Sequence, residues 1–107
     1  IAYGDTTLLD TEEDYKSVSD FRIFQNYPNP FNPSTIISYD LPKASRIRLE
    51  LFNVLGEKVA LLVDDEMEAG RHTCELSSQR LNLPSGIYIC RIITNNFVKS
   101  IKMNLIK

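Results

Sequence analysis

Residues 46–51 read RIRLEL, in which Ile47, Leu49 and Leu51 alternate with charged side chains. Successive side chains of a β-strand point to opposite faces of the sheet, so this spacing puts the apolar residues on one face and the charges on the other. The pattern predicts a strand with one face in a core and one in water. Such one-sided burial is typical of antiparallel sheets.

Short segments of the same kind lie on both sides of this strand. Residues 37–41 alternate similarly and stop at Pro42, which has no N–H for a β-ladder. Residues 87–93 are apolar on both faces, which is typical of a central strand. We expect seven strands, at residues 22–26, 37–41, 46–51, 58–63, 72–76, 87–93 and 97–106.

Turn residues separate these segments at a spacing of about ten. Gly56 allows the positive φ that closes a hairpin, and a longer connection ends at Gly86. The last hairpin is predicted at Asn95 and Asn96. An acidic turn is expected from Asp64, Asp65, Glu66, Glu68 and Gly70. We therefore predict an all-β fold, a seven-stranded antiparallel sandwich of the immunoglobulin or fibronectin type.

The first 20 residues are polar and acidic and lack sustained periodicity. We predict an extended N-terminal arm or linker over residues 1–20 and one domain over residues 21–107. The 107 residues include 12 Lys and Arg against 14 Asp and Glu, a net charge of -2, which argues against nucleic-acid binding. No apolar run approaches the about 20 residues that span a bilayer, so no membrane span is expected.

The most specific motif is FQNYPNPFNP at residues 24–33, with three prolines between aromatic residues. It is followed by STIISYDLPKASRIRLELFNVLGEKVALLVD, AGRH, LPSGIYICRI and finally FVKSIKMNLIK. In this order the motifs resemble the type A C-terminal sorting domain that the type IX secretion system of Bacteroidota recognises. The resemblance covers residues 21–107.

The resemblance implies a non-catalytic, immunoglobulin-like module without a cofactor, which carries the export signal of secreted proteins from the periplasm to the cell surface or medium. It implies two partners, the outer-membrane secretion machinery and an upstream cargo protein. Because the C-terminal segment is needed for recognition in that family, it assigns recognition to Lys99, Lys102, Met103, Leu105 and Lys107. Lysines on this last strand could equally protect an exposed sheet edge from aggregation.

The proline-rich motif has two interpretations. As structure, it fixes φ at three positions and caps the open end of the sandwich; as function, it is a docking surface for export machinery. The motif and turn positions concerned are Tyr27, Pro28, Asn29, Pro30, Phe31, Asn32, Pro33, Gly56, Gly86 and Tyr88.

The sequence gives little support for a catalytic site or a metal site. His72 is the only histidine, and nucleophilic catalysis needs a nucleophile, a base and an orienting group. The acidic run lacks the Asp-x-Asp-x-Asp-Gly spacing of a calcium loop. No metal-spaced Cys/His set or phosphate loop is present. We expect no enzyme activity.

Cys74 and Cys90 fall on the predicted inward faces of two strands, which we expect to lie in opposite sheets. The two residues could then form an inter-sheet disulfide, which a periplasmic or extracellular route permits. Closing a loop of about 17 residues in this way would stabilise the fold by roughly 3 kcal/mol. The alternative is two buried thiols acting as small apolar side chains.

Two other function classes are compatible with the sequence. In the first, the chain is an extracellular structural subunit that self-associates into a filament when residues 1–20 add as a strand to a neighbour's sheet. In the second, it is a carbohydrate-binding or adhesive module, which would need exposed coplanar aromatic side chains; the chain has no Trp.

Overall fold

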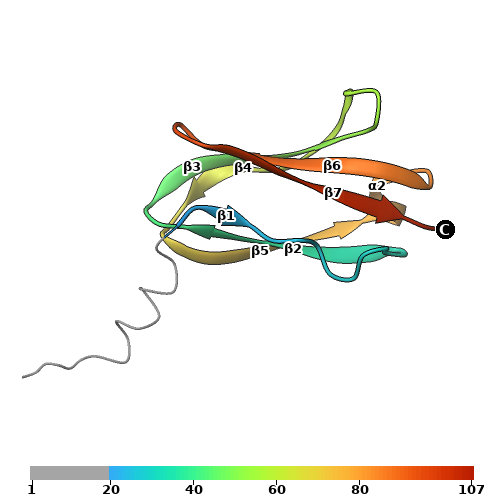
Figure 1. The fold of residues 1–107 in the computed structure, drawn as a ribbon, viewed down its shortest axis with the longest axis horizontal. Helices are drawn as coiled ribbons and strands as arrows, with labels where there is room; N and C mark the ends of the chain where they lie inside the picture. The colour runs from blue at the N-terminus through green and yellow to red at the C-terminus, as the bar shows by residue number, and fades with distance from the viewer. Residues whose placement is uncertain (1–19) are drawn as a thin grey trace, which may run out of the picture.

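The computed structural model describes residues 20–107 and folds them into two antiparallel sheets packed face to face (Figure 1). Apart from Asp20, the predicted arm lies outside the described residues. The three-stranded sheet has the order β1-β2-β5 and the four-stranded sheet the order β4-β3-β6-β7. The elements are β1 (Arg22–Ile23), β2 (Ser34–Leu41), β3 (Ser45–Phe52), β4 (Lys58–Met67), β5 (Gly70–Ser77), a short helix α2 (Ser78–Leu81), β6 (Gly86–Ile93) and β7 (Val98–Leu105). The predicted seven-stranded sandwich is confirmed.

The core lies between the sheets and is built from the alternating residues that the sequence predicts. The RIRLEL strand is the middle part of β3, and Ile47, Leu49 and Leu51 are fully buried. β6 lies between β3 and β7, which confirms the central strand. The other fully or nearly fully buried apolar side chains on strands are Ile37, Tyr39, Leu41, Leu76, Tyr88, Cys90, Ile92, Met103 and Leu105.

The predicted acidic turn is wrong, because most of the acidic run belongs to β4. The strand continues through Asp64, Asp65 and Glu66 to Met67, so that residues 68 and 69 alone connect it to β5. Glu66 and Asp64 lie opposite Arg46 and Arg48 in the ladder with β3. Such cross-strand pairs of opposite charge stabilise a sheet. Arg46 and Asp64 form an ion pair at 2.9 Å, which helps the acidic run to remain a strand.

Two other elements differ from the sequence-based expectation. β1 comprises Arg22–Ile23 alone, shorter than residues 22–26. The connection before β6 begins with α2, where no helix was expected. Ser77 caps its start by accepting a hydrogen bond from Arg80 N at 3.2 Å, and Asn82 ends it in the left-handed conformation. Among residues 20–107, no helix is long and apolar enough to cross a membrane.

Candidate recognition surface at the last strand

β7 is an edge strand that pairs with β6 along its whole length. Its side chains alternate, so Met103 and Leu105 point into the core and are 0% and 1% exposed. Lys99 and Lys102 are exposed, as is Lys107 beyond the end of the strand. The five residues assigned to recognition thus separate into three accessible cations and two core residues.

The proline-rich segment closes the free edge of β7 near its end. Phe31 N donates to Asn104 O at 3.0 Å, and Ile106 N donates to Phe31 O at 3.1 Å, which makes a parallel bridge between Phe31 and Leu105. Asn104 N donates to Asn29 Oδ1 at 3.0 Å. The Phe31 side chain is 2% exposed and belongs to the core. The motif and the last strand therefore form one unit, which we call the seam.

Gln25 extends the seam, because its Nε2 donates to Lys102 O at 2.8 Å. Sequence reasoning missed both Gln25 and Asn104. Their contacts join positions more than 70 residues apart, and no local pattern reports such a pairing.

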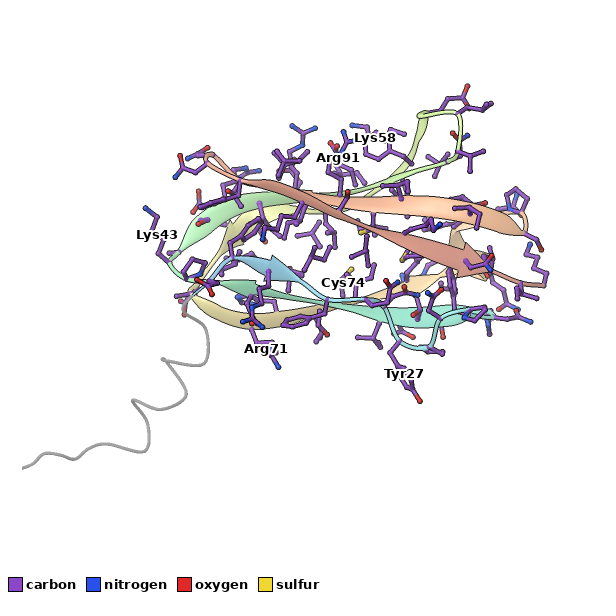
Figure 2. The ribbon with its side chains drawn as sticks, in the orientation of Figure 1. Tyr27, Lys43, Lys58, Arg71, Cys74 and Arg91 are labelled. Carbon is purple, nitrogen blue, oxygen red and sulfur yellow. The ribbon has the colours of Figure 1, made fainter. Side chains whose placement is uncertain are left out.

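The rest of the motif ties the seam to the three-stranded sheet. Tyr27 exchanges two backbone hydrogen bonds with Ile36, while its side chain is 80% exposed (Figure 2). Thr35 Oγ1 donates to Pro28 O at 2.8 Å, and Ser78 N donates to Pro33 O at 2.8 Å. The peptide bonds before Pro28, Pro30 and Pro33 are all cis, and Pro30 and Asn32 are exposed. These contacts support the structural interpretation of the motif.

The remaining turn positions hold the ends of the strands. Gly56 has φ 84° in the hairpin between β3 and β4, a conformation that favours glycine. Gly86 has φ 153° at the start of β6. Tyr88 donates its hydroxyl to Pro84 O, and burial raises the pKa of this tyrosine. Lys107 N donates to Ser85 Oγ at 3.1 Å, so the end of the chain is held against the same turn.

Other candidate side chains have structural surroundings. The His72 ring stacks on Tyr39 with ring centroids 5.6 Å apart, and its Nε2 lies 2.7 Å from Glu68 O. In the part of the chain that the structure describes, no three His, Cys, Asp or Glu side chains gather as a metal site would require.

The two cysteines lie on β5 and β6, in opposite sheets as predicted, and both are free thiols. Cys90 is fully buried, and Cys74 packs against the core from a half-buried position (Figure 2). Burial raises the pKa of Cys74, and burial with the nearby Cys74 raises the pKa of Cys90 to about 12.

Comparison with protein families identifies a match over most of the chain. A family model described as a secretion system C-terminal sorting domain matches residues 25–107, which include the seam and every strand except β1. No curated protein matches the chain.

Proposed function

The chain belongs to the secretion system C-terminal sorting domain family, and we propose that it directs its cargo through the type IX secretion system by presenting the exposed lysines of the last strand. Members of this family are non-catalytic sorting modules. As a sorting domain, the chain directs the export of a cargo protein to the cell surface or medium and interacts with secretion machinery. We further propose that the cargo passes through the periplasm and that the machinery lies in the outer membrane.

The seam is the observation that supports this proposal. Asn29, Phe31 and Gln25 hold the backbone of β7 from one side while β6 holds it from the other. The strand is therefore fixed within a folded domain, and its side chains have defined directions. Met103 and Leu105 contribute by anchoring β7 in the core, because neither is accessible to a partner of the folded domain.

The accessible part of the signal is then cationic. Lys99, Lys102 and Lys107 are exposed, and none of them makes an ion pair within residues 20–107. Unpaired cations favour an acidic surface on the machinery, which they attract over a distance set by the Debye length. We propose that residues 21–107 are the sorting domain and that residues 1–20 link it to the cargo.

A reporter fusion tests the proposal. The whole chain is fused behind a reporter protein that carries a signal peptide, in a bacterium with a type IX secretion system. The double variant Lys99→Gln/Lys107→Gln removes two charges without removing a core strand, whereas deleting residues 99–107 would take Met103 and Leu105 from the core. Lys102 is left unchanged because it also lines a groove on the outer face of the sheet. We expect the variant reporter to accumulate in the periplasm.

The matched control is Lys43→Gln/Arg80→Gln, which removes two exposed cations that lie outside β7 and make no ion pair within the described residues. This control should be exported like the parent. Retention of the parent fusion in the periplasm contradicts the sorting proposal itself. Normal export of the Lys99/Lys107 variant contradicts the role of these lysines.

A further inference from the structure

A groove lies on the outer face of the four-stranded sheet, away from the core. The hairpin between β3 and β4 rises from this face (Figure 1). Its residues Asn53, Val54 and Gly56 form one wall of the groove. The groove has a volume of about 390 Å³ and is lined by Phe52, Asn53, Val54, Gly56, Ile87, Ile89, Arg91 and Lys102. Neither the seam nor the anchoring of β7 uses this space.

The floor of the groove is apolar because of the strand register. Ile89 lies opposite Phe52 on β3 and opposite Lys102 on β7, so the three side chains form one row across the sheet. Ile87 continues the floor along β6, and Val54 on the hairpin wall is 70% exposed. The guanidinium of Arg91 lies over the Phe52 ring at 4.6 Å.

Charge distinguishes the two halves of this sheet face. On the side of β3 and β4 the cations are paired: Arg46 with Asp64, and both Arg48 and Lys58 with Glu50. Arg91 and Lys102 border the groove, and neither makes an ion pair within residues 20–107. After Glu75 the sequence contains no Asp or Glu side chain. No residue of β6 or β7 can therefore neutralise these two cations, and Glu50, which lies opposite Arg91 on β3, forms its ion pairs with Arg48 and Lys58 instead.

We propose that this groove binds an extended acidic peptide segment that carries an apolar side chain. The apolar side chain rests on Ile87, Ile89 and Phe52, and the flanking carboxylates meet Arg91 and Lys102. A planar guanidinium already oriented by an aromatic ring is suited to a carboxylate. The floor favours a peptide side chain over a polyanion, whose phosphates would leave the apolar surface uncovered. The groove shares Lys102 with the proposed cationic signal, but the inference does not rest on the sorting function.

Fluorescence anisotropy of a labelled peptide tests the inference with the whole purified chain. The probe is the blocked peptide Asp-Glu-Leu-Phe-Glu-Asp with an N-terminal fluorophore, and two companion peptides replace either its acidic residues with Lys or its Leu-Phe pair with Ser. We expect saturable binding of the first peptide only, and weaker binding at higher salt, since salt screens exposed charges.

Substitutions then locate the binding site. Arg91→Glu and Lys102→Glu should each weaken binding by about tenfold or more, because each places a carboxylate against the carboxylates of the peptide. Lys43→Glu makes the same charge change at the far end of the sandwich (Figure 2) and should leave binding unchanged. Ile89→Thr keeps a β-branched side chain and should weaken binding through the floor alone. Circular dichroism and the thermal midpoint verify that each variant is folded.

The inference is overturned if the parent chain does not bind the acidic peptide. It is also overturned if Lys43→Glu weakens binding as much as Arg91→Glu, since the attraction is then one of overall charge. Equal binding of the Ser-containing peptide would likewise overturn it, because the apolar floor would then contribute nothing.

Discussion

Arg71 holds the carboxylate of Asp40 at two points, with Nε 2.7 Å from Oδ1 and Nη2 3.0 Å from Oδ2. The Asp40 side chain is only 1% exposed, and the two residues lie opposite each other on β2 and β5. The guanidinium also lies over the Phe24 ring at 4.7 Å. Its hydrogen bonds to Asp40 raise the pKa of Arg71. A buried carboxylate depends on such a partner, because transfer from water is costly for an unpaired charge.

Arg71→Met should lower the thermal midpoint of unfolding at neutral pH. The substitution removes the ion-pair partner of the buried Asp40 carboxylate, and Asp40→Asn in the same background should restore part of the loss. The comparison is Arg46→Met, which removes a partner from Asp64, whose side chain is 39% exposed. That variant should change stability by no more than about 1 kcal/mol. Equal losses in the two Arg variants would contradict the assigned difference in burial.

Phe31→Ala should destabilise the domain by about 3 to 5 kcal/mol, because the side chain is 2% exposed and its removal leaves a cavity next to the last strand. Urea unfolding measures this change. Hydrogen exchange should be faster at the Ile106 amide, which donates a hydrogen bond to Phe31 O. The control from the same motif is Tyr27→Ala. Its side chain is 80% exposed, and we expect a change within about 0.5 kcal/mol.

Glu50 should make the domain sensitive to acid. Its side chain is 4% exposed and contacts Arg48 and Lys58. Burial raises the pKa of Glu50, but the hydrogen bonds from the two cations lower it more, so the pKa lies below its ordinary value of 4.5. The stabilisation from the carboxylate is therefore present above pH 4.5 and lost as the pH falls through the folded pKa.

Glu50→Gln tests this acid sensitivity. Because both cations are about half exposed, we expect a loss of only about 1 kcal/mol at neutral pH. The difference between variant and parent should shrink as the pH falls below 4.5. A difference that stays constant with pH would show that the effect comes from packing rather than from charge.

Alternation in the sequence was sufficient to predict the inward faces of β2 and β3, because each of these strands has one apolar face. β6 is apolar on both faces, and this pattern predicted its central place in the sheet. The turn predicted for the acidic run of β4 was wrong, because Asp64 pairs with Arg46 on the neighbouring strand and a local pattern does not include such a partner. Cross-strand charge therefore overrode the usual association of acidic residues with turns.

The contacts of the candidate site could not be predicted from local sequence patterns either. The proline-rich motif and the last strand were each identified along the chain, yet their contact joins positions 75 residues apart. The register of β3, β6 and β7 places Phe52, Ile89 and Lys102 in one row, and this register cannot be read from any one of the three strands. The groove was therefore not among the sequence-based predictions.

Tyr39 should cause a loss of stability at alkaline pH. Burial, with the nearby Cys74, raises the pKa of Tyr39 from 10.0 to about 12. The unfolded chain then loses this proton at lower pH than the folded domain does, so stability falls as the pH rises from 10 toward 12.

Tyr39→Phe should remove this part of the alkaline loss. At neutral pH the variant should be as stable as the parent or more stable by up to about 1 kcal/mol, because the buried hydroxyl has no hydrogen-bond partner within residues 20–107. Urea unfolding across this pH range provides the measurement. Tyr27→Phe, at an exposed position, is the control and should follow the parent. A Tyr39→Phe profile that also follows the parent contradicts the prediction.

The disulfide between Cys74 and Cys90 remains a prediction, and the flank of the sandwich offers a route for its formation. A cavity of about 190 Å³ between β4 and α2 is lined by Cys74, Leu61, Leu81 and neighbouring residues, so an oxidant can reach Cys74 while Cys90 stays buried. For protein that has been exported to an oxidising compartment, we expect the intact mass of the chain to rise by about two hydrogens on reduction. The bridge should contribute roughly 3 kcal/mol, so reductant should lower the thermal midpoint of the parent. In Cys90→Ala the reductant should have no effect. Identical masses before and after reduction would mean that the pair serves as two buried thiols.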